Sequence, residues 1–407
     1  MCVLPLMSLD HTRGPPAYDA RMTDLASLSR RTNHLREASI LRALTLKVNA
    51  FDDGINLGQG VCDLEMPGAL RDAAIRSLTE DRATYTNFAG IKPLREQIIR
   101  RMRERYDLSY EMDEVVVTVG SSMAYTSTLM TLIDPGDEVI LFEPFYPYHY
   151  TGALLAGATV RSIPLSLGDG GIQWDKLEGA LCDRTRLIVL NTPSNPLGKV
   201  WTTDELDRLA ALLDTSPAYI VTDEIYEDLV YDGREHVPPA TRPGLYERTI
   251  TISGLSKAYS ITGWRLGWLA APKALSGAIG PVFDVLAVCA SRPLQHAAAA
   301  ALAELPETYY TELRDGYSVR RRLLCDALRS GGFQVREPEG SYYVMADYTD
   351  RWGADTDPED ACFRLLDEAR IAAIPATIFY AERPRPELRF QFAVEDTILE
   401  EVGRRLG

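Results

Sequence analysis

Two cationic side chains lie eight residues apart in a segment that otherwise contains only small, polar and apolar residues. Lys257 and Arg265 follow an apolar, β-branched run at 249–252, and serine and glycine residues surround the lysine. Burial lowers the pKa of a lysine and prepares it for Schiff-base chemistry, whereas an arginine holds a phosphate group through paired hydrogen bonds. A single lysine is most often a solvated surface charge, but the place of Lys257 directly after an apolar strand argues against that interpretation.

A second candidate is an anion-binding helix start. The apolar run at 115–119 leads into Gly120, Ser121 and Ser122, where a helical pattern begins. The N-terminus of a helix offers free N–H groups and the positive end of its dipole, and small residues let an anion approach closely. The segment therefore predicts a phosphate cradle. Taken alone, it fits an ordinary serine N-cap without a ligand even better.

Two further apolar runs end in polar residues. Asn195 lies in a loop with two prolines and a glycine after the run at 186–190, and Asp223 follows the run at 219–222, with Tyr226 three residues later. Burying a carboxylate is costly unless a cationic partner faces it, so Asp223 is a candidate for binding a cationic group. A plain turn at Asn195 and a helix-capping role for Asp223 are the alternatives.

The elements that must position these residues alternate between strand and helix. Apolar runs typical of strands lie at 114–119, 138–142, 186–190, 219–222 and 249–252, with helical patterns at 122–133 and 203–213. Such alternation indicates a parallel sheet covered by helices on both faces, and ligands bind such sheets at the carboxyl ends of the strands.

The pattern changes after about residue 295, where long helices at 295–305 and 309–329 precede short strands at 342–347 and 388–392. We interpret this part as a second lobe, completed by residues from the N-terminal side. We therefore expect a flexible N-terminal extension at 1–24, an N-terminal arm with part of the small domain at 25–70, a large domain at 71–294 and a C-terminal small domain at 295–407.

The composition argues against several classes of function. The net charge is −15 and no lysine- or arginine-rich block occurs, so neither a nucleic acid nor a membrane is expected as a partner. The six cysteines are scattered without a C-x-x-C pair, which suggests neither a metal site nor a disulfide framework. Free thiols fit a reducing compartment, and no apolar run of about 18 residues is present to span a membrane. We expect a cytoplasmic protein.

The order of these features is more specific than any one of them. A phosphate cradle, an asparagine loop, a buried aspartate with a tyrosine, and a lysine followed by an arginine together resemble the fold-type I enzymes that use pyridoxal 5′-phosphate (PLP), in the class I/II aminotransferase group. Within that group the chain is most similar to the kynurenine aminotransferase and glutamine transaminase K branch. The resemblance covers residues 25–407 and is carried by the segments INLGQGVCD (55–63), YTNFAGIKPLR (85–95), EPFYPY (143–148), LNTPSNPLGKV (190–200), TDEIYEDLVYDG (222–233), ERTITISGLSKAYSITGWRLGW (247–268), PEGSYYVMADY (338–348), IPATIFY (374–380) and LRFQFA (388–393).

The resemblance implies an α/β fold, with a large domain built on a mainly parallel seven-stranded sheet flanked by helices and a smaller α+β lobe. It also implies that Lys257 holds PLP as an aldimine and later moves the α-proton. Asp223 would pair with the pyridine nitrogen and so keep the ring an electron sink, and Tyr226 and Asn195 would bind the 3-oxygen of the ring. Four residues would hold the phosphate, and Tyr146 would stack on the ring; the four are Ser121, Ser122, Ser256 and Arg265.

The remaining family positions concern the substrate and a second subunit. Arg389 matches the arginine that binds the α-carboxylate of the substrate, a bidentate role that lysine fills less well. Asn195 would contribute to the same site, and Gly60 matches the glycine that lets the substrate lie against the backbone of the small lobe. Tyr85 matches the tyrosine that reaches the phosphate of the neighbouring subunit, which implies a homodimer with shared active sites.

Three departures from the family pattern affect the expected site. Gly254 stands where a serine is frequent, without an expected loss of cofactor. Cys62 and Leu64 replace a proline and an aromatic residue. Ser122 replaces a tyrosine of the kynurenine branch, and Cys289 and Ala290 stand near the place of an aromatic residue and a histidine, so we expect a pocket less suited to aryl side chains. Ala287 near the position of a carboxylate-binding arginine also disfavours acidic substrates, although Arg292 lies close by in the sequence.

The predicted activity is transfer of the α-amino group of an L-amino acid to a 2-oxo acid through a Lys257 aldimine and pyridoxamine phosphate. The alternative is β- or γ-elimination or replacement on the same scaffold, as in cysteine-conjugate lyases or S-adenosylmethionine-using relatives, because the same site residues serve both reactions and fold does not fix function. A non-catalytic PLP sensor in a transcription regulator is a third interpretation. The resemblance begins at about residue 25, and the residues before it are too few for a DNA-binding domain.

Overall fold

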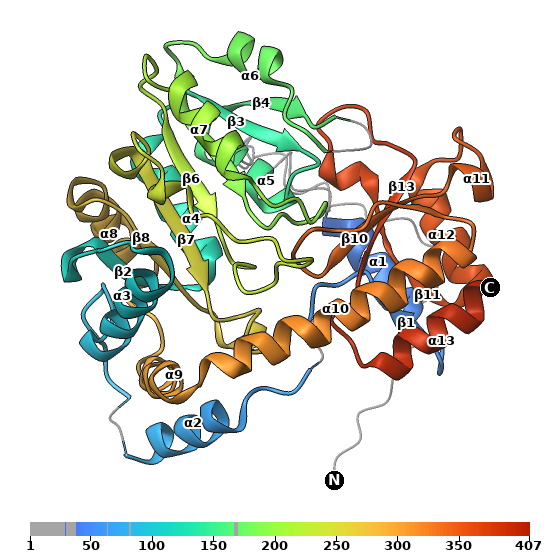
Figure 1. The fold of residues 1–407 in the computed structure, drawn as a ribbon, viewed down its shortest axis with the longest axis horizontal. Helices are drawn as coiled ribbons and strands as arrows, with labels where there is room; N and C mark the ends of the chain where they lie inside the picture. Colours follow the sequence, from blue (N-terminus) through green and yellow to red (C-terminus); the bar gives the residue numbers. More distant parts are fainter. Residues whose placement is uncertain (1–28, 30–37, 63, 81–82, 167–169) are drawn as a thin grey trace, which may run out of the picture.

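The computed structural model describes residues 29, 38–62, 64–80, 83–166 and 170–407, which form a large lobe and a small lobe (Figure 1). The extension predicted at 1–24 lies outside the described residues. Within the part of the chain that is described, no helix is both long and apolar enough to cross a membrane.

The large lobe is built on a seven-stranded sheet with the strand order β2-β8-β7-β6-β5-β3-β4. Only β8 is antiparallel to its neighbours, β2 and β7, so the expected mainly parallel sheet is confirmed. The bounds of its strands are β2 (Val115–Val119), β3 (Glu138–Glu143), β4 (Thr159–Pro164), β5 (Thr185–Asn191), β6 (Tyr219–Asp223), β7 (Thr249–Gly254) and β8 (Leu266–Ala270).

The five apolar runs of the sequence all form strands, but β4 and β8 were not among them. Strand β4 lies at the edge of the sheet and pairs only with β3. Its residues are half exposed, because only one of its long sides is covered. Strand β8 is fully buried, but it is short and follows Arg265 directly, so the sequence does not separate it from the segment that contains the lysine.

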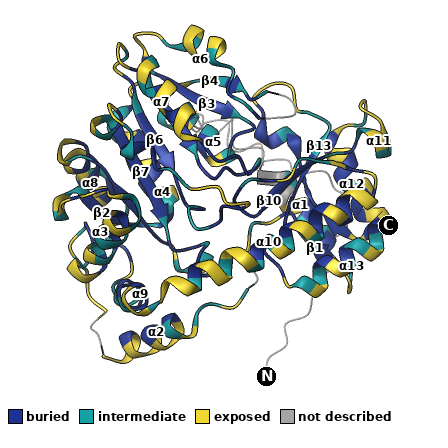
Figure 2. Ribbon diagram, viewed as in Figure 1, coloured by how far each residue is buried: buried dark blue, intermediate teal, exposed yellow. Residues whose placement is uncertain are grey.

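Helices cover both faces of this sheet, because alternate strand residues point to opposite sides. Ile140 and Ile188 pack on one face, whereas Val139 and Val189 pack on the other. One face is covered by α4 (Gly120–Leu132), α5 (Pro147–Ala156) and α8 (Lys273–Ala287). The opposite face is covered by α6 (Trp174–Ala180), α7 (Thr203–Leu212), α3 (Lys92–Tyr106) and α9 (Arg292–Glu304), with α2 (Gly68–Glu80) against α9. Apart from the edge strand β4, the strands are therefore mostly buried, whereas the outer faces of the helices are exposed (Figure 2).

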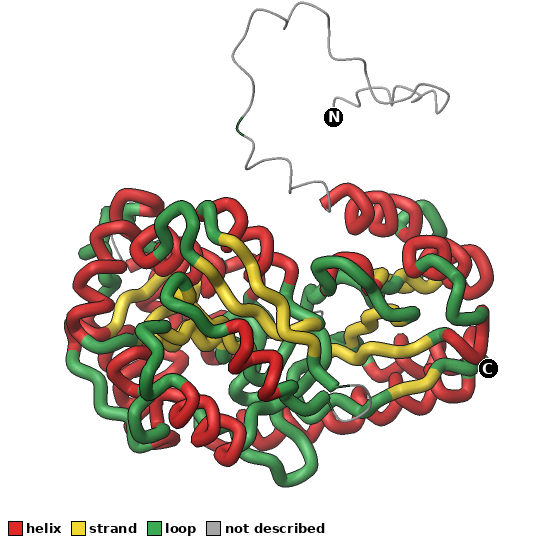
Figure 3. The backbone as a smooth tube through the Cα atoms, turned by 90° about the horizontal axis from the view of Figure 1, so that it is seen from above, coloured by secondary structure: helices red, strands yellow, loops and turns green. Residues whose placement is uncertain are grey.

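The small lobe combines residues from both ends of the described chain. Its four-stranded sheet has the order β12-β13-β10-β9, and β1 pairs in parallel with β11. The strands lie beside the large lobe and between helices when seen from above (Figure 3). The bounds are β1 (Ile55–Asn56), β9 (Gln334–Val335), β10 (Tyr343–Asp347), β11 (Ile371–Ala372), β12 (Ile374–Pro375), β13 (Glu387–Gln391), α1 (Ala38–Val48), α10 (Glu307–Ser330), α11 (Thr349–Trp352), α12 (Pro358–Ala369) and α13 (Asp396–Leu406).

The predicted domain limits at 25–70, 71–294 and 295–407 remain predictions. Helix α9 bears on them, since it packs against α2 and α3 rather than on the small lobe. Helix α10 then runs from the large lobe to the small lobe and packs along α13 (Figure 1). These contacts favour a boundary after α9. Short 3₁₀ turns complete the fold: η3 (Met112–Glu114), η4 (Pro239–Thr241), η5 (Tyr246–Arg248), η6 (Thr262–Trp264) and η7 (Ala376–Phe379).

Candidate active site

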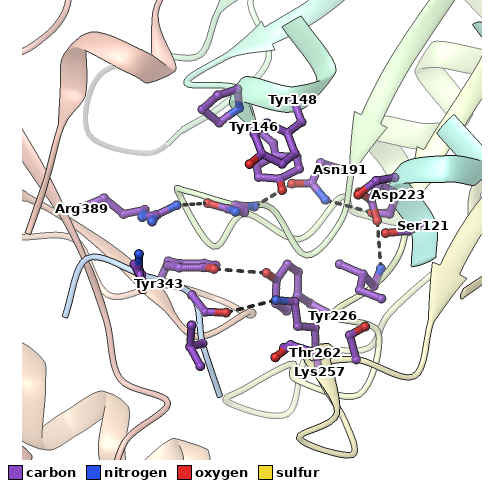
Figure 4. A pocket seen from close by; sticks show the side chains of 18 of the residues that line it. Ser121, Tyr146, Tyr148, Asn191, Asp223, Tyr226, Lys257, Thr262, Tyr343 and Arg389 are labelled. Atoms are coloured by element: carbon purple, nitrogen blue, oxygen red, sulfur yellow. Dashed lines mark hydrogen bonds between the residues drawn. The ribbon is translucent and has the colours of Figure 1, made fainter. Parts of the chain in front are cut away.

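A cavity of about 580 Å³ lies between the carboxyl ends of the large-lobe strands and the small lobe (Figure 4). Both lobes line this cavity. The large lobe contributes residues at or after the ends of β2, β5, β6 and β7, and the small lobe contributes residues after β1 and in β10, β12, η7 and β13. All but one of the predicted site residues line it. They are Gly60, Ser121, Ser122, Tyr146, Asn195, Asp223, Tyr226, Ser256, Lys257, Arg265 and Arg389.

Tyr85 is the exception. It lies outside the lining of this cavity, and 80% of its surface is exposed. Ala287, Cys289, Ala290 and Arg292 also lie outside the lining, whereas Ser122 faces the cavity. Of the residues expected to make the pocket less suited to aryl side chains, Ser122 therefore lines the cavity, whereas Cys289 and Ala290 do not.

The anion-binding end of the cavity is the start of α4. The helix has Val119 at its N-cap, without a capping side chain, so Ser121 and Ser122 lie in the first turn and the ordinary serine N-cap does not apply. Gly120 has a φ of +72°, and a Cβ there would lie 2.5 Å from Nη2 of Arg265. Only glycine therefore brings the guanidinium against the helix start, where free N–H groups and the helix dipole favour an anion.

The aspartate lies at the base of the cavity. Asp223 ends β6 and is 4% exposed, and its Oδ2 lies 3.1 Å from Nε2 of His149. Its Oδ1 accepts a hydrogen bond from the backbone N–H of Ile225 at 3.2 Å, and Asn191 donates to its backbone carbonyl. Among the described residues that line the cavity, Asp223 is the only acid. These contacts hold a carboxylate where a cationic ring nitrogen could pair with it.

The lysine lines the cavity from the segment after β7. Lys257 Nζ donates to the backbone carbonyl of Gly60 at 3.3 Å, and Tyr342 donates its hydroxyl proton to the same carbonyl at 3.0 Å. A Cβ at Gly60 would lie 1.8 Å from the hydroxyl oxygen of Tyr343. Glycine at this position therefore leaves the space that the Tyr343 hydroxyl occupies beside the lysine.

Two tyrosine hydroxyls meet beside the lysine. Tyr226 donates to the hydroxyl oxygen of Tyr343 at 3.4 Å. Burial raises the pKa of Tyr226 well above its usual value, with a further contribution from Tyr343. Burial also acts to raise the pKa of Tyr343, but the positive charges of Lys257 and Arg389, with hydrogen bonds from Tyr226 and Tyr342, outweigh it and lower that pKa.

The second arginine is held from both lobes. Arg389 is 7% exposed; its Nη1 donates to Oδ1 of Asn195 at 2.9 Å and its Nη2 to the carbonyl of Gly58 at 2.6 Å. Its guanidinium lies 4.3 Å from the ring centroid of Tyr343. A fixed, buried guanidinium of this kind is suited to bidentate binding of a carboxylate.

Several residues that line the cavity or lie behind its lining escaped the sequence analysis. His149 lies within α5 and does not directly follow a strand, so no sequence pattern marks it. Only the fold brings its ring to the carboxylate of Asp223. Tyr343 lies in a segment that carries the family resemblance, but only the pairing of β10 with β13 places its ring beside Arg389. The others are Gly58, Gln59, Val61, Pro147, Tyr148, Asn191, Ile225, Thr262, Ile374 and Ile378.

The departures from the family pattern have local structural reasons. A Cβ at Gly254 would lie 2.9 Å from the carbonyl oxygen of Leu266, so strand β8 leaves no room for a serine there. Cys62 is buried, and its sulfur lies 3.0 Å from the hydroxyl of Tyr317 and 3.1 Å from that of Ser260.

Among the described residues, no group of three or more histidine, cysteine or acidic side chains could hold a metal ion.

The sheet order and the cavity define a fold-type I enzyme with a buried aspartate, a lysine and two arginines in one site. The family model for class I and II aminotransferases matches residues 52–406. A probable N-succinyldiaminopimelate aminotransferase of Mycobacterium tuberculosis is 33% identical over 381 residues, which cover 90% of this chain and 94% of that protein. Kynurenine–oxoglutarate transaminase 3 of Mus musculus is 33% identical over 384 residues, with 87% and 84% covered.

Solved structures agree with the sequence comparison. The N-succinyldiaminopimelate aminotransferase of M. tuberculosis has a TM-score of 0.88 at 32% identity, covering 94% of this chain and 99% of that chain. A methionine aminotransferase of Escherichia coli has a TM-score of 0.88 at 29% identity, with the same coverage. The chain therefore belongs to the class I and II aminotransferase family. It is a PLP-dependent transferase that moves amino groups, as its family and relatives indicate.

Proposed function

We propose that the cavity binds PLP on Nζ of Lys257 and transfers the α-amino group of an L-amino acid to a 2-oxo acid. The observation that carries this proposal is the arrangement of the charged groups. Asp223 is buried at the base, Arg265 lies against the glycine that starts α4, and Arg389 lies on the small-lobe side of the same cavity. A cationic ring nitrogen, a phosphate and a carboxylate are the three groups that this set fits.

The residues divide the work of holding the cofactor. Arg265 and the first turn of α4 would hold the phosphate with Ser121, Ser122 and Ser256. Asp223 would bind the ring nitrogen, and Asn195 and Tyr226 would bind the 3-oxygen, with Tyr146 stacked on the ring. When bound, PLP withdraws electrons from the α-carbon of an attached amino acid and so weakens its C–H bond.

The protein groups then orient the substrate and move its proton. Arg389 would bind the α-carboxylate, and Gly60 would leave room for the substrate against the small-lobe backbone. With its amine free, Lys257 would take the α-proton as a general base and return it as a general acid. The two hydrogen bonds that fix Arg389 reduce the freedom of the bound carboxylate and thereby orient the C–H bond.

The substrate side chain that the lining favours is neutral and not aryl. Ser122, Ile374 and Ile378 line the cavity, and its cationic lining residues already have roles in the proposal. We also assign the chain to the kynurenine aminotransferase and glutamine transaminase K branch on its sequence motifs. The mouse kynurenine transaminase and the mycobacterial N-succinyldiaminopimelate aminotransferase are each 33% identical to it. Because these two relatives are named for different substrates, sequence identity does not select the substrate of this chain.

The proposal includes a homodimer with shared sites and a cytoplasmic location. Tyr85 is 80% exposed, and Val285 at the end of α8 is 86% exposed. Phe88, three residues after Tyr85, packs against Gly280 of that helix. The net charge of −15 and the scattered cysteines support the cytoplasm.

Mixed dimers test the shared site. Lys257→Ala and Tyr85→Ala protomers, each defective alone, are combined by denaturing and refolding both together. If Tyr85 serves the neighbouring subunit, each mixed dimer contains one site with both defects and one site with neither, and activity returns. Activity that stays at the level of the separate variants would show that Tyr85 acts within its own chain or not at all.

The reaction itself is tested with the purified protein and PLP. The lysine-linked cofactor should absorb in the visible range, and Lys257→Ala should lose the linkage that borohydride reduces. A panel of neutral, acidic and aryl L-amino acids should then convert the cofactor to its pyridoxamine form, fastest with the neutral ones. Release of ammonia or a leaving group without that conversion would support elimination or replacement instead.

A further inference from the structure

One lining residue to which the proposed function gives no task is Tyr343. It begins β10 in the small lobe and is 3% exposed, although it lines the cavity. Its ring lies under the guanidinium of Arg389, at 4.3 Å from centroid to Cζ. Its hydroxyl lies 3.4 Å from that of Tyr226 in the large lobe. Figure 4 shows the phenol between these two side chains.

The backbone leaves the phenol little freedom. A Cβ at Gly60 would lie 1.8 Å from the hydroxyl oxygen of Tyr343, so the hydroxyl occupies the space that the missing side chain leaves. The ring packs edge to face against Tyr226, at 5.9 Å and 84°. A side chain fixed on three sides holds its hydroxyl at one place in the cavity without further loss of entropy.

Each of the two phenols has a single proton to donate, and this decides whether the Tyr343 hydroxyl donates or accepts. A phenol donates one hydrogen bond and accepts others. Tyr226 donates to Tyr343 in the present structure. Once Tyr226 donates its proton to the 3-oxygen of the cofactor ring, that proton is no longer available to Tyr343. The same contact then requires Tyr343 to donate to the oxygen of Tyr226, and hydrogen bonds in such a chain strengthen one another.

The charges beside the pair favour that direction. Burial raises the pKa of Tyr226, whereas the charges of Lys257 and Arg389 bring the pKa of Tyr343 below its usual value against the effect of its own burial. The more acidic phenol is the better donor, so Tyr343 is suited to donate and Tyr226 to accept.

We propose that Tyr343 is a positioning residue that donates a hydrogen bond to Tyr226 and, through it, tunes the proton affinity of the lysine-linked cofactor, while its ring supports Arg389. This inference rests on the proposed function. A donor behind Tyr226 makes the proton of Tyr226 a stronger partner for the negatively charged 3-oxygen. Stabilising that negative charge lowers the pKa of the neighbouring lysine linkage, because less charge remains to attract its proton.

The variant Tyr343→Phe removes the hydroxyl and keeps the ring on Arg389. The pKa of the linkage, followed by absorbance against pH without substrate, should rise by roughly half a pH unit, as expected for the loss of one indirect hydrogen bond. The kcat should fall a few-fold while the KM of the amino acid changes by less than about twofold, because the carboxylate site is retained.

Two further variants separate the proposed role from a general effect on folding. Tyr348→Phe removes another buried hydroxyl, which binds the carbonyl of Thr356 away from the cavity at 2.7 Å, and it should leave the linkage pKa unchanged. In a Tyr226→Phe background, Tyr343→Phe should have no additional effect on that pKa, since Tyr343 acts through Tyr226.

The outcomes are distinct. An unchanged linkage pKa in Tyr343→Phe, or an equal shift with and without Tyr226, would overturn the inference while the proposed function stands. Absence of any lysine-linked absorbance in the unsubstituted protein would overturn the proposed function, and the inference with it.

Discussion

Arg389 and Asn195 join the two lobes across the cavity through a hydrogen bond of 2.9 Å between Nη1 and Oδ1. Arg389 belongs to β13 of the small lobe, and Asn195 follows β5 of the large lobe. The amide of one lobe therefore fixes the guanidinium of the other. Because Asn195 is also expected to bind the 3-oxygen of the cofactor, the contact links the carboxylate site to the cofactor site.

Replacing Arg389 by lysine should weaken substrate binding without loss of the cofactor. A lysine keeps the positive charge but cannot bind Asn195, Gly58 and a carboxylate in the same plane. We expect kcat/KM for the preferred amino acid to fall on the order of 10- to 100-fold, with the affinity for PLP unchanged. Steady-state kinetics and a PLP titration measure both quantities.

A matched control is Arg385→Lys. Arg385 donates to the carbonyl of Leu165 at 2.9 Å and lies outside the cavity lining. This variant should keep wild-type kinetics. A kcat/KM in Arg389→Lys equal to that of the control would contradict the assignment of Arg389.

Asp223→Asn tests the charge at the base of the cavity. The amide is nearly the same size, but it carries no negative charge to hold a protonated ring nitrogen. We expect kcat to fall by about 100-fold or more, in the range found when a preorganised electrostatic partner is removed. The fold should remain, since the amide oxygen can still accept the hydrogen bond from Ile225.

The control for this variant is Glu224→Gln at the neighbouring residue. Glu224 is equally buried, but its carboxylate lies 2.7 Å from Nε2 of His236 and does not line the cavity. Circular dichroism and kcat are measured for both variants. A comparable loss of kcat in the two would mean that any disturbed carboxylate at this strand end is harmful, and Asp223 would lose its special role.

Gly120→Ala should weaken cofactor binding through the phosphate end. The new Cβ would lie 2.5 Å from Nη2 of Arg265, in a backbone with a φ of +72°. The substitution should therefore move the guanidinium and destabilise the protein by about 1–3 kcal/mol. The dissociation constant of PLP, measured by fluorescence or absorbance, should rise at least several-fold.

Gly136→Ala separates the two effects. Gly136 has a φ of +102°, but a Cβ there meets no atom within 4 Å. It should show the loss of stability without the loss of PLP affinity. Equal PLP affinities in the two alanine variants would show that the absence of a Cβ at Gly120 is not required for Arg265 to bind the phosphate.

The strand ends were the part of the site that sequence patterns could predict. Ser121, Asn195, Asp223 and Lys257 each follow an apolar run, and parallel strands bring such residues to one edge of the sheet. Arg389 required the family resemblance, because it lies within a strand of the other lobe. No local pattern marks that position.

The remaining residues could not be predicted because long-range packing places them. His149 reaches Asp223 from α5 over a separation of 74 residues, and Tyr343 reaches Tyr226 over 117 residues. The edge strand β4 escaped the pattern of continuous apolar runs because its first four residues alternate between exposed and half-buried positions. The packing of α9 on the large lobe also depends on its contacts with α2 and α3, which its own sequence does not reveal.

The acid stability of the large lobe should depend on Glu138. Its carboxylate accepts hydrogen bonds from Arg161 at 3.0 Å and from Arg184 at 2.6 Å. The bond from Arg161, followed by the bond from Arg184, lowers the pKa of Glu138 from 4.5 to about 2 against the effect of burial. A carboxyl group with a lowered folded-state pKa stabilises the fold above its unfolded pKa, and this stabilisation is lost as the pH falls from about 4.5 towards 2.

Glu138→Gln should therefore reduce the free energy of unfolding by about 1–3 kcal/mol at pH 7, as expected for hydrogen bonds to a charged group. The difference from the unsubstituted protein should shrink as the pH falls below 4.5 and nearly vanish near 2. Urea denaturation at several pH values measures it, with Glu235→Gln, at an exposed glutamate, as the control. A difference that stays constant from pH 7 to pH 3 would show that Glu138 stabilises the sheet edge by its shape and not by its charge.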